Sequence, residues 1–113
     1  MRVLDREGVL IRVFIGESDQ WHHQPLATAL LERLRREGFA GATVFRGSAG
    51  FGARSILHTM HLLRLSEDLP VLLEIVESPE NVPRLQAILD EMVDDGLVTM
   101  EKVQVLKYSP GNR

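Results

Sequence analysis

The stretch VLIRVFI at residues 9–15 decides the fold, because it is rich in β-branched residues and almost entirely apolar. Such a run fits a strand that is central in a sheet or covered on both faces. An amphipathic helix is predicted next, with Pro25 at its first position, leucines at every fourth position from 26 to 34, and Gly38 as its C-terminal stop. The polar residues of that helix form its solvent face: Glu32, Arg33, Arg35, Arg36 and Glu37.

The rest of the chain continues this alternation of strands and helices. The sequence predicts strands at 42–46 and 69–76, with Pro70 near the start of the second, where a missing N–H is tolerated. A second helix is expected to begin at Asn81 as its cap, with Pro83 in the first turn. Its apolar stripe consists of Val82, Leu85, Ile88, Leu89 and Met92. A last strand is predicted at 98–108.

The order of these elements is β-α-β-β-α-β, and the two halves echo each other. Glu37-Gly38-Phe39 follows the first helix and Asp95-Gly96-Leu97 follows the second, each time before a strand. Two such units with right-handed crossovers give an α+β, ferredoxin-like fold: a four-stranded antiparallel sheet with both helices on one face. Because the strands are apolar, the uncovered sheet face is expected to be buried by a partner subunit.

Composition limits the classes of protein that fit. The chain of 113 residues suits one domain spanning 1–113, and its 44% hydrophobic content can form a modest core. A formal net charge of -3 argues against a general nucleic-acid binder, and the absence of cysteine excludes disulfides and thiolate metal sites. No apolar run approaches the roughly 18 residues of a membrane span. We therefore expect a cytoplasmic protein without membrane insertion.

The strongest candidate site is the stretch VFRGSAGFGARS at residues 44–55. It contains Gly47, Gly50 and Gly52, flanked by Arg46 and Arg54. Exposed backbone N–H groups in such a turn can bind an anion, and arginine adds bidentate phosphate contacts. If the anion is the phosphate of a nucleotide, the ring of Phe51 is expected to pack against the nucleotide base. The alternative is that the glycines form a β-bulge and a tight turn.

Two residues that follow the first strand, Glu17 and Ser18, could lie at the mouth of the same cleft and contact a ribose or an amine. The alternative for them is a polar turn that precedes the first helix.

The histidines suggest a metal only weakly. His58 and His61 would share one face of a helix, and His22-His23 form a second pair, but no carboxylate lies at an obvious third position. Surface histidines are the alternative. An enzyme is not expected, because the chain has no cysteine nucleophile and no Gly-x-Ser-x-Gly elbow, and no triad can be argued from Ser48 and Ser55.

A set of short motifs, found in this order, resembles one family. They are Gly16-Glu17-Ser18, Gly41-Ala42-Thr43-Val44, Arg46-Gly47, Gly50-Phe51-Gly52, His58-Thr59, Leu65-Ser66-Glu67-Asp68-Leu69-Pro70 and Asp90-Glu91-Met92-Val93. Together they resemble the small PII-like proteins grouped as domain of unknown function one-ninety, over about residues 9–108. That family is similar in fold to PII signalling proteins and to CutA proteins.

The resemblance implies a homotrimer with three clefts between subunits. In PII proteins these clefts bind adenine nucleotides, and a long loop after the second strand responds to the ligand and contacts a target. Here that loop corresponds to 51–67. Modification by uridylylation is unsupported, because the tyrosine that PII proteins can carry in the loop is absent and Tyr108 is the only tyrosine.

The sequence thus predicts a PII-like signalling protein that binds ATP, ADP or AMP and regulates a partner protein, such as a transporter or a metabolic enzyme. The predicted nucleotide-binding residues are Glu17, Ser18, Arg46, Gly47, Gly50, Phe51, Gly52 and Arg54. The alternatives are a CutA-like trimer that binds a divalent metal through His58 and His61, and an oligomeric scaffold without a small ligand.

Overall fold

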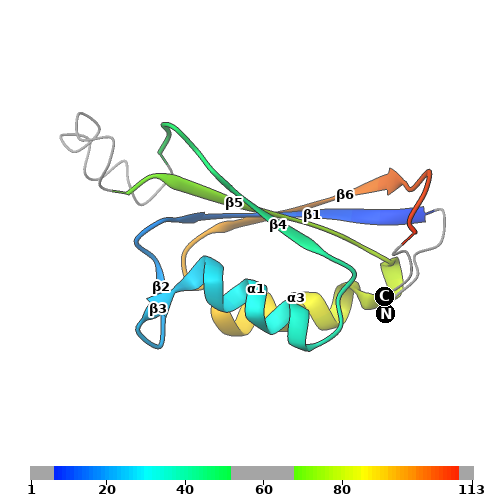
Figure 1. The fold of residues 1–113 in the computed structure, drawn as a ribbon, viewed down its shortest axis with the longest axis horizontal. Coiled ribbons are helices and arrows are strands. Elements are labelled where there is room, and N and C mark those ends of the chain that lie inside the picture. The colour runs from blue at the N-terminus through cyan, green and yellow to red at the C-terminus, as the bar shows by residue number, and fades with distance from the viewer. Residues whose placement is uncertain (1–6, 52–67, 110–113) are drawn as a thin grey trace.

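A computed structural model describes residues 7–51 and 68–109, which form a four-stranded sheet, a two-stranded hairpin and a helical layer (Figure 1). In chain order the elements are β1 (Glu7–Gly16), β2 (Gln20–Trp21), β3 (Gln24–Pro25), α1 (Leu26–Arg36), β4 (Ala42–Arg46), β5 (Pro70–Glu77), the 3₁₀ turn η2 (Pro79–Asn81), α3 (Val82–Met92) and β6 (Leu97–Gln104).

The sheet has the strand order β4-β5-β1-β6, and every neighbouring pair is antiparallel. Helices α1 and α3 lie on the same face of it, as Figure 1 shows. This arrangement confirms the predicted α+β, ferredoxin-like fold. Among the described residues no helix is long and apolar enough to cross a membrane.

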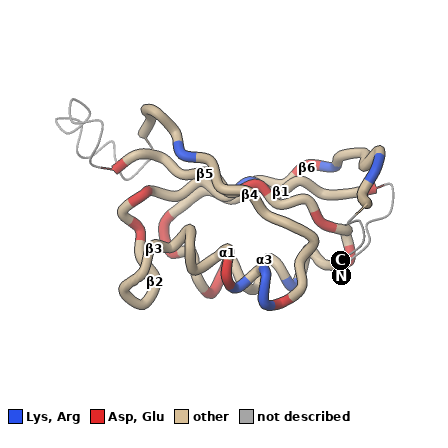
Figure 2. The backbone as a smooth tube through the Cα atoms, viewed as in Figure 1, with Lys and Arg blue, Asp and Glu red and all other residues tan. Residues whose placement is uncertain are grey.

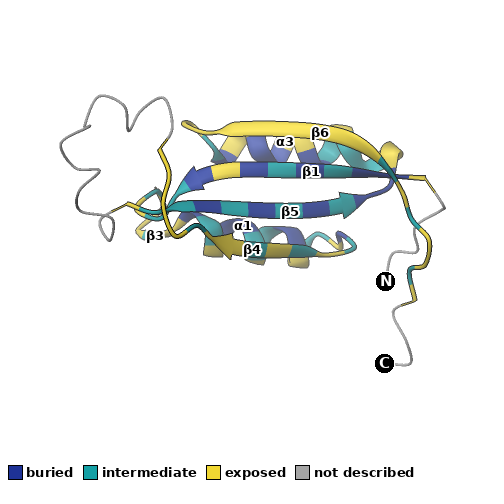
Figure 3. Ribbon diagram, turned by 90° about the horizontal axis from the view of Figure 1, so that it is seen from above, coloured by how far each residue is buried: buried dark blue, intermediate teal, exposed yellow. Residues whose placement is uncertain are grey.

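The core lies between the sheet and the two helices. Alternate residues of the central strands point into it, so that Val13 of β1 and Leu73 and Ile75 of β5 are fully buried. Leu30 of α1 and Leu85 of α3 cover them from the helical side. Figure 3 shows this alternation of buried and less buried residues along β1 and β5. The predicted apolar stripes of both helices are thus confirmed.

No helix among residues 7–51 and 68–109 covers the opposite face of the sheet, which exposes large apolar side chains. Phe14 of β1, Phe45 of β4 and Leu97 of β6 are 38%, 48% and 57% exposed. In the middle of this outer face Arg12 donates to Glu74 of β5 at 3.0 Å and to Glu101 of β6 at 2.6 Å. The outer face is therefore an apolar surface with a charged centre, whereas the sequence pattern predicted an apolar surface alone.

Several element boundaries differ from the sequence-based expectation. Pro25 belongs to β3 and precedes α1, so it is not the first helical residue. The last strand ends at Gln104, four residues earlier than the predicted 108. The reason is pairing: Gln104 lies opposite Glu7, the first residue of β1, so later residues have no described strand beside them. The small hairpin of β2 and β3 was not predicted.

The helix ends are confirmed in part. Gly38, with a φ of +81°, follows α1 in the left-handed conformation that glycine adopts without strain. Asn81 does precede α3, but its side chain makes no cap hydrogen bond there. Instead its amide donates to the Glu77 carboxylate at 3.0 Å. The side chain therefore ties the start of α3 to the end of β5.

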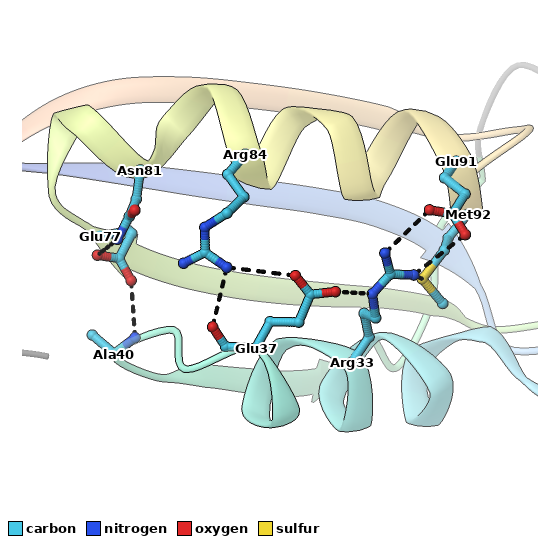
Figure 4. A network of polar contacts seen from close by, with 8 residues as sticks. All are labelled: Arg33, Glu37, Ala40, Glu77, Asn81, Arg84, Glu91 and Met92. Carbon is cyan, nitrogen blue, oxygen red and sulfur yellow. Dashed lines mark hydrogen bonds and ion pairs between the residues drawn. The ribbon is translucent and has the colours of Figure 1, made fainter. Parts of the chain in front are cut away.

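Polar contacts join the two helices on their outer side (Figure 4). Arg33 of α1 pairs with Glu37 and also with Glu91 of α3, so it is not simply part of a solvated face. Arg84 of α3 donates to the Glu37 carbonyl oxygen at 3.0 Å, and its guanidinium lies 4.0 Å from the centre of the Phe39 ring. These contacts fix α1 and α3 against each other over the core.

Candidate functional site

Three strand ends meet where the candidate residues lie. β4 ends at Arg46, β5 begins at Pro70 and β1 ends at Gly16, and β5 lies between the other two. Arg46 is opposite Val71, and Gly16 is opposite Pro70. The sheet therefore brings residues about 30 positions apart in the sequence to the same end of the molecule.

Arg46 and Glu17 form an ion pair across this end of the sheet. The Arg46 side chain is 64% exposed and the Glu17 side chain 33% exposed. Figure 2 shows the basic end of β4 and the acidic turn after β1 on the same side of the molecule. The structure thus joins two of the residues that the sequence singled out, and it leaves most of the Arg46 side chain exposed to solvent.

Backbone hydrogen bonds hold both partners of this pair in place. The N–H of Glu17 donates to the Leu69 carbonyl oxygen at 2.8 Å, and the N–H of Gly47 donates to the Pro70 carbonyl oxygen at 2.7 Å. Since the Gly47 N–H is used in this way, it does not point a free donor at a phosphate. The predicted role of Gly47 in nucleotide binding stays a prediction.

The glycines instead allow a close approach to Pro70. A Cβ on Gly47 would lie 2.6 Å from Cγ of Pro70, and a Cβ on Gly50 would lie 3.0 Å from the same atom. Any larger residue at position 47 would force the chain or the proline ring to move. Tight packing of the turn after β4, the alternative reading of these glycines, thus accounts for Gly47 and Gly50.

The turn after β1 is held by two carboxylates. Asp19 accepts a hydrogen bond from the Gly16 N–H at 2.9 Å. Asp68 accepts one from the Ser18 N–H at 3.0 Å, which joins this turn to the residue just before β5. Ser18 is exposed. Sequence reasoning assigned no role to Asp68; its only signal was its place in a motif next to Leu69 and Pro70.

The aromatic candidate, Phe51, is 64% exposed, and it is the last described residue after β4. Gly52 and Arg54 lie outside the described residues, as do the predicted loop from 52 onward, His58 and His61. Their predicted roles in nucleotide or metal binding remain predictions.

The other two histidines form the tip of the β2–β3 hairpin. His22 and His23 have φ values of +47° and +70°, a conformation that residues other than glycine rarely adopt. The ring of Trp21 stacks on that of His22, with centroids 4.3 Å apart. Within the described part of the chain, no group of three or more His, Cys, Asp or Glu side chains could hold a metal ion.

A shallow groove of about 250 Å³ lies between α3 and β6, at the far edge of the sheet from β4. Its lining is largely apolar and includes Ile11, Leu85, Leu89, Val98 and Met100. None of the predicted site residues lines it, so it is separate from the site at the strand ends.

Comparison with known proteins identifies the family. The model of the DUF190 family, described as Uncharacterized ACR, matches residues 8–105. A UPF0166 protein of Aquifex aeolicus is 36% identical over 108 residues, covering 94% of this chain and 98% of that protein. A UPF0166 protein of Methanocaldococcus jannaschii is 31% identical over 99 residues, covering 87% and 91%.

Solved structures share the fold at low sequence identity. The chain resembles CPII of Thiomonas intermedia K12, solved with ADP, AMP and acetate, with a TM-score of 0.63, 16% identity and coverage of 89% and 90% of the two chains. It also resembles a functionally unknown protein of Pediococcus pentosaceus, with a TM-score of 0.53, 14% identity and coverage of 95% and 100%. The chain belongs to the DUF190 family, which is the family that its motifs resemble.

Proposed function

We propose that this protein is a PII-like regulatory protein that binds an adenine nucleotide through its phosphates at Arg46. The observation that carries the proposal is the guanidinium of Arg46, held at a strand end with 64% of the side chain exposed. Arginine presents a fork of donors that matches the geometry of a phosphate. The likeness in fold to a protein solved with ADP and AMP supports the same ligand class.

The base of the nucleotide would pack against an exposed aromatic ring. Phe51 follows the glycine turn and is 64% exposed. A phenylalanine ring stacks on any base, with about 1–3 kcal/mol per stacked base in other systems. In this proposal Arg46 supplies the charge for the phosphates and Phe51 supplies the apolar surface for the base.

The proposed binding unit is a homotrimer with the nucleotide in the clefts between subunits. Support comes from the outer face of the sheet, where Phe14, Phe45 and Leu97 are exposed together. Apolar faces of this kind are commonly covered by another copy of the chain. The proposed output is binding of a partner protein, such as a transporter or an enzyme, through the loop at 51–67, and the protein itself is a cytoplasmic regulator and not an enzyme.

The test is isothermal titration of ATP, ADP and AMP into protein that has been stripped of ligand, together with light scattering. The expected result is saturable binding of at least one nucleotide by a trimer, and a loss of about tenfold or more in affinity in Arg46→Ala, because a charge-assisted phosphate contact is removed. Arg35→Ala removes an exposed arginine from α1 and serves as the matched control. Absence of nucleotide binding, or equal affinities of Arg46→Ala and the control, contradicts the proposal.

A further inference from the structure

We propose that Glu17 is an internal competitor for the phosphate site: its carboxylate pairs with the Arg46 guanidinium that a nucleotide phosphate would use. This inference rests on the proposed function and adds a residue that sets how tightly an anion binds. The two groups form an ion pair between the ends of β1 and β4. A ligand phosphate must therefore displace the Glu17 carboxylate or share its guanidinium.

Backbone hydrogen bonds hold the chain in place at Glu17 and directly after Arg46. Glu17 is fixed by its N–H bond to Leu69, and Arg46 is followed directly by Gly47, whose N–H is bound to Pro70. Leu69 and Pro70 are adjacent, so both anchors lie on the same two residues at the start of β5. The pairing of three strands consequently places the backbones of the two residues at the same end of the sheet, within reach of each other's side chains.

Further carboxylates around the pair are expected to repel a phosphate. The turn that carries Glu17 also carries Asp19, and Asp68 is bonded to the Ser18 N–H of the same turn. Among the residues that the structure describes at this strand end, carboxylates thus outnumber the single guanidinium of Arg46. A phosphate would approach a locally acidic surface, and neutralising Glu17 would both release the guanidinium and reduce the repulsion.

The exposed setting limits the size of the effect. Exposed ion pairs contribute about 0.2–1 kcal/mol, which corresponds to a change in affinity of about 1.5- to fivefold. Glu17→Gln keeps the size of the side chain and removes its charge. Nucleotide affinity is therefore expected to rise by about 1.5- to fivefold in this variant.

The experiment is a double-mutant cycle read by isothermal titration of ATP, ADP and AMP, each in turn, into Glu17→Gln, Arg46→Ala, the double variant and the wild-type protein. Glu80→Gln is the charge-matched control, because Glu80 is exposed and follows the opposite end of β5. Thermal unfolding followed by circular dichroism verifies that all variants are folded. The cycle separates an action through Arg46 from a general effect of net charge.

Support for the inference consists of tighter binding by Glu17→Gln, an unchanged affinity in Glu80→Gln, and no gain from Glu17→Gln when Arg46 is already alanine. Detectable ADP binding by Glu17→Gln alone, with none by the wild type, supports it as well. The inference is overturned if Glu17→Gln binds as the wild type does or more weakly, since Glu17 would then be neutral or a direct ligand contact. It is also overturned if the gain persists without Arg46. Absence of binding of ATP, ADP and AMP alike in both the wild type and Glu17→Gln overturns the proposed function, and this inference with it.

Discussion

The carboxylate of Glu77 accepts a hydrogen bond of 2.9 Å from the backbone N–H of Ala40, which lies 37 residues earlier in the chain. Its other oxygen accepts hydrogen bonds from the N–H and hydroxyl of Ser78 and from the Asn81 amide. Glu77 is fully buried at the end of β5. One carboxylate thus joins the segment before β4, the end of β5 and the start of α3, as Figure 4 shows for Ala40 and Asn81.

Removal of this carboxylate is expected to destabilise the fold. Glu77→Ala leaves buried donors without an acceptor, and the expected loss in the free energy of unfolding is about 3 kcal/mol. Urea unfolding followed by circular dichroism measures it. Glu80→Ala, at an exposed neighbouring position, is expected to change stability by less than about 0.5 kcal/mol. Equal losses in the two variants would contradict the anchoring role of Glu77.

Glu77 is also expected to make the free energy of unfolding decrease as the pH falls into the acid range. Burial raises the pKa of Glu77, but the hydrogen bonds donated by Ala40, Asn81 and Ser78 outweigh burial and hold its pKa below the usual range. Because the folded pKa lies below the unfolded value of about 4.3, this stabilisation is complete above that pH and is lost as the pH falls through the folded pKa. The hydrogen bond from Arg33 likewise lowers the pKa of Glu37, so this residue also stabilises the fold less in acid.

We therefore expect the urea midpoint of the wild type to fall more between pH 6 and pH 3 than that of Glu77→Gln. The variant starts from a lower stability at pH 6, and the two curves approach each other in acid. Parallel curves across this range would show that Glu77 titrates alike in the folded and unfolded chains.

Because Gly47 packs closely against Pro70, the stability lost in a Gly47 variant should be restored in part by a second substitution at Pro70. Gly47→Ala places a Cβ 2.6 Å from the proline ring and is expected to cost about 1–3 kcal/mol of stability through overpacking. Pro70→Ala in the same chain removes the ring and is expected to restore part of the loss. Gly41→Ala is the control, since a Cβ there meets nothing within 4 Å. Thermal unfolding distinguishes them, and an equal cost at positions 41 and 47 would refute the role of this contact.

A charged residue placed on the outer face of the sheet is expected to dissociate the proposed trimer. Leu97 is 57% exposed on β6, so Leu97→Lys leaves the core intact. In the proposed trimer the new charge would be buried without a partner, and dissociation to folded subunits of 12.7 kDa is expected. Light scattering with size exclusion measures the mass. Thr28→Lys, on the exposed side of α1, is the control, and an unchanged mass in Leu97→Lys would contradict burial of this face.

Local sequence patterns determined most of the secondary structure. The run at 9–15 became part of β1, an inner strand of the sheet on which buried residues alternate with less buried ones. Gly38 follows the end of α1 with a φ of +81°. Both results follow from side-chain periodicity and from the conformational freedom of glycine, which act over a few residues. The motifs also gave the family correctly, because their order along the chain is itself a sequence property.

The tertiary structure decided what those residues touch. Arg46 and Glu17 were both named as candidates, but only the strand order β4-β5-β1 brings them into an ion pair. The same strand order lets the Gly47 N–H donate to the Pro70 carbonyl oxygen. It also places Arg12 between Glu74 and Glu101. A sequence fixes which residues alternate along a strand, whereas pairing between strands sets their neighbours, and that pairing depends on contacts between segments far apart in the chain.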